Sequence, residues 1–339
     1  MKKLILLIMV SALMLVSACS SNSNDDNQTS TKDNNIQELE IKVSYENAEN
    51  TPKHKGAVKM KEYIEAETNG KIKVHLYPNG TLFGDNEEMD NLYANNVQFI
   101  IPSLTELAGL DPVYNLHTLP FIYESEESAL QFWDGEKGKS ILNGLEEHGL
   151  VGMSIWPNGE VAITNNTRPI VTPEDMKGLI FRIIGGQLTE SMYQQFGAGT
   201  ERIPFAELYT SLEQGALDGQ ENAISNVNAS KLDEVQKYMT VTGQGRVDYV
   251  VLTNTKFYSS LNETTKKIIE EGVKRGTEES RINAKQLNDQ ALQDLKDRGE
   301  IEITTLTPEQ RKVFREELQP IYDEWIPIIG EDIINELLK

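Results

Sequence analysis

The sequence predicts an α/β fold in which two lobes are joined by crossing strands and by a long helix. Each half of the chain alternates apolar strands with helical segments, a pattern typical of parallel-sheet units. An apolar strand at 247–254 follows the second lobe, and an almost continuous helical pattern without proline covers 264–298. A chain that crosses between lobes more than once indicates a hinge, and small ligands commonly bind in the cleft beside one.

The first half alternates strands and helices from residue 39 onward. Apolar residues alternate in the strand segments and recur at helical spacing between them, and Asn69-Gly70 ends the first helix. The expected elements are a strand at 39–45, a helix at 52–68, a strand at 71–77, a helix at 86–94 and a strand at 97–101. This β-α-β-α-β order predicts a parallel sheet.

The second half of the chain also alternates strands and helices. Thr172 is a capping residue ahead of Pro173 and early acids, and Gly178 ends the short helix that they begin. A strand at 179–184, a helix ending at 196–197 and a helix at 206–214 follow. The tail opens with a capping box from Thr307 to Gln310 and closes in helix.

The N-terminus predicts a bacterial lipoprotein signal. Lys2 and Lys3 precede an apolar segment at 4–16, and small residues lead directly into Cys19, the single cysteine of the chain. Cleavage before Cys19 would leave its thiol to carry lipid, so we expect an extracytoplasmic protein anchored to the cell membrane. The polar residues 19–38 then form a disordered tether.

The charge balance narrows the choice of partners. The 53 Asp and Glu residues outnumber the 32 Lys and Arg residues, which gives a net charge of −21. Such a chain disfavours nucleic acid and anionic lipid as partners. A cationic pocket for an anionic ligand would therefore be a local exception.

Arg182 is the main candidate for such a pocket, because it lies inside an otherwise apolar strand. A guanidinium stays charged and its planar fork of donors matches a carboxylate, so burying one is costly unless an anion meets it. The anion could be a ligand. It could equally belong to an internal ion pair.

The sequence lacks complete motifs for catalysis, metal binding or nucleotide binding. The stretch from Gly135 to Ser140 has too few residues between its glycines for a phosphate loop, and Gly243-Gln244-Gly245 lacks the third glycine of a dinucleotide fingerprint. The four histidines are far apart, and no nucleophile elbow is present. Acid pairs such as Glu87-Glu88 and Glu146-Glu147 are expected on helix surfaces. We therefore expect neither an enzyme nor a bound metal or cofactor.

Four blocks resemble the solute-binding subunits (DctP type) of tripartite ATP-independent periplasmic (TRAP) transporters. They begin at Lys71 (KIKVHLYPNGTLFGDNEEM), His117 (HTLPFIYES), Thr164 (TNNTRPIVTPEDMKGLIFRIIGG) and Ile203 (IPFAELYTSLEQGALDGQEN). The resemblance implies a periplasmic-binding-protein-like fold that closes on a small organic acid and passes it to membrane permease subunits. The implied division is 39–158 plus 248–287 for one lobe and 159–247 plus 288–339 for the other, after a signal at 1–18.

The resemblance also implies roles for individual residues. Arg182 matches the family's carboxylate-binding arginine, and Asn222 matches an amide that hydrogen-bonds the ligand, although a turn asparagine is the alternative. Phe205 matches an aromatic of the cleft, which core packing would explain equally well. The remaining positions expected at the cleft are Trp156 as a stacking wall, Tyr249, Glu46, Ser103 and Glu106.

Two departures from the family pattern bear on the ligand. Val161 stands where many members carry a second arginine, and Ala223 replaces a proline. Without a second arginine, and with Glu46 and Glu106 nearby, a dicarboxylate is less attractive than a hydroxyl-rich monocarboxylate such as a sugar acid. Two rival functions remain open. One is a receptor for a membrane sensor, and the other is a surface hydrolase of sugar acids that uses acids such as Glu46, Glu106 and Glu160.

Overall fold

The computed structural model describes residues 35–338. Its strands form one mixed sheet in the order β2-β1-β3-β8-β4-β7-β5-β6, with β9 paired to β8. Their bounds are β1 (Leu39–Ser44), β2 (Ile72–Tyr77), β3 (Phe99–Ile100), β4 (Leu150–Asn165), β5 (Ile180–Arg182), β6 (Gly199–Glu201), β7 (Gly219–Ala223), β8 (Tyr238–Asn254) and β9 (Glu302–Thr305). The predicted signal at 1–18, Cys19 and most of the tether lie outside the described residues.

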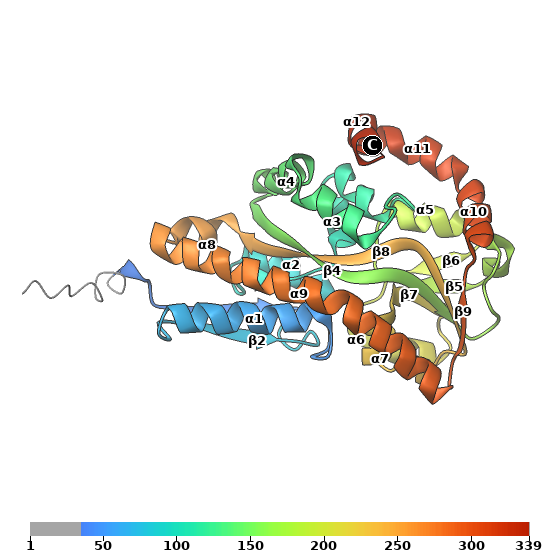
Figure 1. The fold of residues 1–339 in the computed structure, drawn as a ribbon, viewed down its shortest axis with the longest axis horizontal. Coiled ribbons are helices and arrows are strands. Elements are labelled where there is room, and N and C mark those ends of the chain that lie inside the picture. The colour runs from blue at the N-terminus through green and yellow to red at the C-terminus, as the bar shows by residue number, and fades with distance from the viewer. Residues whose placement is uncertain (1–34, 339) are drawn as a thin grey trace, which may run out of the picture. The chain divides into compact units, whose positions relative to one another are not determined.

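The long strands β4 and β8 join the two lobes (Figure 1). They pair antiparallel along their length, from Leu150 opposite Asn254 to Asn165 opposite Tyr238. β8 borders the β1–β3 strands of one lobe, and β4 borders β7 of the other. The two-lobed α/β fold with crossing strands is therefore confirmed.

The prediction of a parallel sheet is correct only within each lobe. β1 is parallel to β2 and β3, and β5 is parallel to β6 and β7. The pairs β3–β8, β4–β8 and β4–β7 are antiparallel, because β4 and β8 run in opposite directions through both lobes. The expected strand at 247–254 is only the end of β8, whose earlier residues include glycines and polar side chains that hide its pattern.

The helices pack on the faces of this sheet. Their bounds are α1 (Pro52–Glu67), α2 (Asp85–Tyr93), α3 (Glu126–Asp134), α4 (Glu136–Asn143), α5 (Gln187–Gln195), α6 (Phe205–Glu213), α7 (Ile224–Ala229), α8 (Thr255–Ser260), α9 (Glu263–Arg298), α10 (Pro308–Glu317), α11 (Gln319–Ile329) and α12 (Glu331–Leu337). Thr307 and Gln310 form the predicted capping box of α10. Thr172 also forms a capping box, but the short segment behind it is a 3-10 helix at Pro173–Met176.

The helix α9 spans both lobes. Its 36 residues give a length of roughly 54 Å, and it contacts α1 in the first lobe and α7 in the second. Gly56 of α1 and Gly276 of α9 allow this approach, since a Cβ at either would lie 2.7 Å from the other's carbonyl oxygen. At the other end of α9, Leu295 packs with Leu208 and Val227 in the core beneath α6 and α7.

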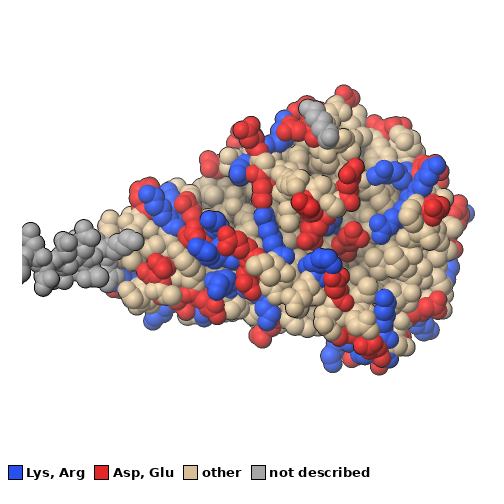
Figure 2. All heavy atoms as spheres, in the orientation of Figure 1, with Lys and Arg blue, Asp and Glu red and all other residues tan. Residues whose placement is uncertain are grey.

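The face of the molecule in Figure 2 carries acidic and basic side chains interspersed, without a broad patch of one sign. Within residues 35–338, none of the helices combines the length and the apolar character that a membrane crossing requires.

Candidate ligand-binding site

A small polar cavity lies where the two lobes meet, with about 20 Å³ of space. That volume holds about one water molecule, so the cleft is closed around it. Residues from both lobes line it, including seven of the eight positions expected from the sequence: Glu46, Ser103, Glu106, Arg182, Phe205, Asn222 and Tyr249. Folding therefore brings together side chains that are far apart in the sequence.

Arg182 enters the cavity from the end of β5, at the carboxyl edge of parallel strands where open α/β sheets usually bind ligands. Its side chain is 2% exposed. Nε donates to the carbonyl oxygen of Ile203 at 3.2 Å, and Nη2 lies 3.7 Å from Oδ2 of Asp85. Burial lowers the pKa of Arg182, and Asp85 opposes that effect. Among the described residues, most of the guanidinium's N–H donors thus have no protein acceptor.

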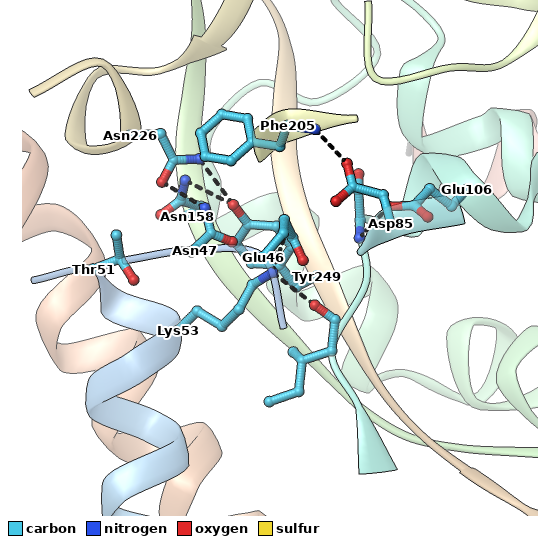
Figure 3. A network of polar contacts seen from close by, with 12 residues as sticks. Glu46, Asn47, Thr51, Lys53, Asp85, Glu106, Asn158, Phe205, Asn226 and Tyr249 are labelled. Atoms are coloured by element: carbon cyan, nitrogen blue, oxygen red, sulfur yellow. Dashed lines mark hydrogen bonds and ion pairs between the residues drawn. The ribbon is translucent and has the colours of Figure 1, made fainter. Parts of the chain in front are cut away.

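Asn222 belongs to a chain of amides beside Arg182. Its Oδ1 accepts from Nδ2 of Asn226 at 2.7 Å and from the backbone N–H of Ala223 at 3.0 Å. Nδ2 of Asn226 also donates to the Tyr249 hydroxyl at 2.9 Å, and Nδ2 of Asn47 donates to Oδ1 of Asn226 at 3.0 Å (Figure 3). These contacts fix the carboxamide of Asn222. Its own N–H₂ group has no partner within the described chain and remains able to donate to a ligand.

Two further polar atoms of the cavity are buried without a hydrogen-bond partner among the described residues. They are Oδ1 of Asn47 and Oγ of Ser103. A buried polar atom without a hydrogen bond costs free energy, so such atoms in a cavity wall indicate a place where a ligand or water binds.

The first lobe contributes a buried ion pair between Lys53 and Glu46. Nζ of Lys53 lies 2.6 Å from Oε1 of Glu46, donates to the Ile101 carbonyl at 2.7 Å and sits 3.4 Å from the centre of the Tyr249 ring (Figure 3). Burial raises the pKa of Glu46 and lowers that of Lys53, and each partner opposes the shift of the other. Because Glu46 already engages Lys53, Arg182 is the cation available to a ligand carboxylate.

Protonation reduces the negative charge around Arg182. Burial raises the pKa of Glu106 to about 8, and the neighbouring carboxylates of Glu46 and Asp85 add to the shift. Glu88 was expected on a helix surface, but it is 2% exposed and accepts from the Ser44 hydroxyl at 2.9 Å. Its pKa is well above the ordinary value, again chiefly through burial. Glu88 stabilises the wall behind the cavity, and the prediction of a solvated acid pair is wrong for this residue.

Trp156 does not line the cavity, contrary to the expected stacking wall. Its side chain is fully buried against Gly56 and Gly276, where α1 and α9 meet β4. The indole Nε1 donates to Oγ1 of Thr277 at 2.8 Å. Successive residues of a strand point to opposite faces, and Trp156 points to the helix-covered face. Its role is to pack α1 and α9 on the crossing strands.

Two of the three acids named for a hydrolase lie in one cavity, and the third does not. Glu46 and Glu106 share the cavity, but Glu160 is half exposed and lies 3.8 Å from Arg311. Among the described residues, no group of three or more His, Cys, Asp or Glu side chains could hold a metal. The Gly135–Ser140 stretch lies at the start of α4 rather than after a strand, so it is no phosphate loop.

Two larger hollows lie on the side of α9. One has about 260 Å³ and includes Lys285 and Asp289, and the other has about 620 Å³ and includes Asp134 and Arg281. Both are open to solvent, and these charges pair with each other, at 2.5 Å and 2.6 Å respectively. These two pairs are already satisfied, whereas Arg182 keeps donors without an acceptor among the described residues, so the cavity at Arg182 is the better candidate.

Comparison with known proteins identifies the family. The model of the DctP family, described as bacterial extracellular solute-binding protein, family 7, matches residues 43–327. The chain belongs to this family. It is therefore a member of a family of solute-binding proteins and not of enzymes, as the resemblance of its four sequence blocks implied.

Individual relatives cover almost the whole chain. The C4-dicarboxylate-binding protein DctB of Bacillus subtilis is 33% identical over 315 residues, 93% of this chain and 89% of its own. A TRAP solute-binding protein from Shewanella oneidensis with bound succinate has a TM-score of 0.86 at 33% identity, covering 88% of this chain and 98% of its own. The sugar acid binding protein DctPAm from Advenella mimigardefordensis, in complex with galactonate, has a TM-score of 0.86 at 30% identity, covering 90% and 98%.

Sequence reasoning missed three polar residues of the cavity, namely Asn47, Asp85 and Asn226. Asp85 is the first residue of α2, where an acid is expected for the helix dipole alone. Asn226 lies in α7, four residues after Asn222 of β7, and nothing in the sequence marks it apart from the other polar residues there. Asn47 follows Glu46 in a loop, where a local turn explains an asparagine equally well.

Proposed function

We propose that this protein captures a small organic acid in the interlobe cleft and presents it to the membrane permease subunits of a TRAP transporter. The observation that carries the proposal is the buried guanidinium of Arg182, whose remaining donors face a polar cavity beside Asn222. A carboxylate there would accept two parallel N–H bonds from the fork in a dehydrated site, where such a pair is strong.

Ligand entry requires the lobes to separate, because the closed cavity holds about 20 Å³. We place the hinge near residues 158–159 and 247–248, where the chain passes from one lobe to the other. Support comes from the irregular pairing of β4 with β8 at Pro157/Gly159 and Glu160/Ala162. Such bulges bend a strand and are common beside binding sites.

The ligand we favour is a hydroxyl-rich monocarboxylate such as a sugar acid. Arg182 is the free cation of the described cavity, Glu46 already occupies Lys53, and the carboxylate of Asp85 would face a second carboxylate. The relatives divide on this point, since the Shewanella protein holds succinate and the Advenella protein holds galactonate.

We also propose that the protein is held at the outer face of the cell membrane through lipid on Cys19. Support comes from the sequence at 2–19 and from family membership in extracellular solute-binding proteins. Mass spectrometry of the mature protein tests this, and a mature N-terminus other than lipid-modified Cys19 would contradict it.

Isothermal titration of the soluble domain against sugar acids and C4-dicarboxylates tests the function. We expect Arg182→Lys to lose about a hundredfold in affinity, because a point charge cannot replace the bidentate fork, with little change in the melting temperature of the ligand-free protein. Arg275→Lys, an exposed substitution on α9, is the matched control and should bind like the wild type. Equal affinity in Arg182→Lys, or collapse of its fold, would refute the clamp. Tight binding of succinate without binding of sugar acids would refute the choice of ligand.

A further inference from the structure

A second small cavity lies directly beyond the first. It has about 20 Å³ of space and shares Ile184 and Val247 with the cavity at Arg182. Its other walls carry the side chains of Thr105, Thr118, Thr189, Glu221 and Gln244. Ile184 and Val247 therefore stand between the two cavities, and a ligand held by Arg182 would have to pass these side chains to enter the second one when the cleft closes around it.

A bulge in β8 aims Gln244 into this second cavity. Arg246 pairs with Glu160 and Val241 with Ala162, so residues 242–245 bulge out opposite Val161. Gly243 has a φ of +60°, a left-handed conformation that glycine adopts without strain. Two hydrogen bonds hold the bulge in place. The Thr242 hydroxyl donates to the Val161 carbonyl at 3.2 Å, and the backbone N–H of Phe121 donates to the Gln244 carbonyl at 2.7 Å. Bulges beside binding sites commonly redirect a side chain.

The carboxamide of Gln244 is buried beside the Tyr193 hydroxyl and the Glu221 carboxyl, with no well-aligned hydrogen bond to the described chain. The residue is 2% exposed, and neither its Nε2 nor its Oε1 makes a hydrogen bond of ordinary geometry with the described chain. Gln244 lies close enough to Tyr193 and Glu221 to oppose the upward pKa shifts that burial imposes on both. A buried amide with two unsatisfied atoms is costly, unless a ligand that carries both donors and acceptors meets it.

The second cavity does not suit a second carboxylate. The Tyr193 hydroxyl donates to Oε2 of Glu221 at 2.8 Å, and burial raises the pKa of Glu221 to about 7. The one guanidinium in its described wall, that of Arg246, donates to both carboxylate oxygens of Asp248 at 2.9 and 3.1 Å. Hydroxyl groups, in contrast, can both donate and accept here.

We propose that the Gly243-Gln244-Gly245 bulge reads the hydroxyl groups at the end of the ligand remote from its carboxylate, with Gln244 as the residue that determines specificity. This inference rests on the proposed function, in which Arg182 holds the carboxylate. Under this proposal the ligand's hydroxyl groups are the hydrogen-bond partners of the Gln244 amide. A ligand that ends in hydroxyl groups needs no second arginine, which is consistent with Val161 opposite the bulge.

Titration calorimetry with two probes separates the two cavities. Gluconate carries a chain of hydroxyl groups that extends away from its carboxylate, whereas lactate has a single hydroxyl next to its carboxylate and serves as the short probe. We expect Gln244→Leu to weaken gluconate binding about tenfold, the loss of one or two buried hydrogen bonds, and to change lactate binding less than about twofold. The melting temperature of the ligand-free protein should change little, because Nε2 and Oε1 of Gln244 make no well-aligned hydrogen bond with the described chain. Gln244→Asn, which keeps the amide but shortens it, should also weaken only gluconate.

The inference is overturned if Gln244→Leu loses affinity equally for gluconate and lactate, or loses affinity for neither. It is also overturned if the wild type does not prefer gluconate to lactate. Arg182→Lys distinguishes this failure from failure of the proposed function. If that variant loses both acids while Gln244→Leu loses neither, the carboxylate clamp stands and only the assignment of Gln244 falls. If Arg182→Lys binds both acids normally, both proposals fall.

Discussion

Two buried arginines, Arg182 and Arg246, differ in how the protein satisfies them. Arg246 is 7% exposed and is held by Asp248 at 2.9 Å and by Glu126 at 3.1 Å. Burial lowers its pKa, but these two carboxylates outweigh burial and the net shift is upward. Arg182 is more deeply buried, yet its nearest carboxylate is 3.7 Å away and the net shift of its pKa is downward. Burial alone therefore does not mark a binding arginine, whereas burial without a matched acceptor does.

The largest expected effect is on stability, at Arg246. Arg246→Leu would leave Asp248, which is fully buried, without its cation. Breaking a buried ion pair in this way costs about 3–5 kcal/mol, so the free energy of unfolding in urea should fall by that amount. Arg182→Leu in the ligand-free protein should cost less than about 1 kcal/mol, because Asp85 keeps its hydrogen bond from the Phe205 backbone N–H at 2.9 Å. If the two variants are equally destabilised, the distinction between a structural and a binding arginine is wrong.

The difference between Arg182 and Arg246 could be predicted only in part from the sequence. Arg182 stands in an apolar strand within a family block, so its special status could be predicted. Arg246 follows the glycines of a bulge and precedes Asp248, and no pattern there indicates that both charges are buried. Whether a buried arginine is satisfied depends on residues far away in the chain, such as Glu126 for Arg246 and Asp85 for Arg182.

The fold was more predictable than the walls of the site. The periodicity of α9 and the capping box at Thr307 depend on neighbouring residues, and both are confirmed. Trp156 and Glu88 were misplaced because the orientation of a side chain depends on which face of a strand or helix tertiary packing covers. The antiparallel return of β4 and β8 was missed for the same reason, since strand pairing is a long-range property.

The second expected effect is a pH dependence that arises from a carboxyl group beside Arg182. The pKa of Glu106 is about 8 in the folded protein and about 4.5 in an unfolded chain. Between these values the folded protein retains a proton that the unfolded chain has released, so stability falls as pH rises. Because Glu106 is partly exposed, we expect about 2 kcal/mol to be lost between pH 5 and pH 8 in the ligand-free protein.

Urea unfolding at several pH values measures this slope. Glu106→Gln should make the slope shallower, because the amide cannot titrate but keeps an oxygen that can accept from the Ser103 backbone N–H. Glu46, Glu88 and Glu221 supply the slope that remains. Glu160→Gln removes a carboxylate that is half exposed and should keep the wild-type slope. An unchanged slope in Glu106→Gln would mean that Glu106 is ionised in the folded protein, and that the surroundings of Arg182 are more negative than we infer.

The smallest effect concerns the carboxylate that Arg182 already faces. Asp85→Asn removes the negative charge 3.7 Å from Nη2 of Arg182 but keeps an oxygen that can accept from the Phe205 backbone N–H. A ligand carboxylate held by Arg182 would no longer be repelled by Asp85, so we expect gluconate to bind about tenfold more tightly, which corresponds to about 1.4 kcal/mol.

Asp90→Asn makes the same change of charge at an exposed position of the same helix, and it should leave the affinity unchanged. Asp248→Asn, the matching change beside Arg246, should lower stability without tightening gluconate. Weaker binding in Asp85→Asn would show instead that Asp85 accepts a hydrogen bond from a ligand hydroxyl. Arg182 and Asp85, which belong to opposite lobes, would then both bind the ligand. The difference between Arg182 and Arg246 would lie in what Asp85 and Asp248 contact, and not in how far each carboxylate is from its guanidinium.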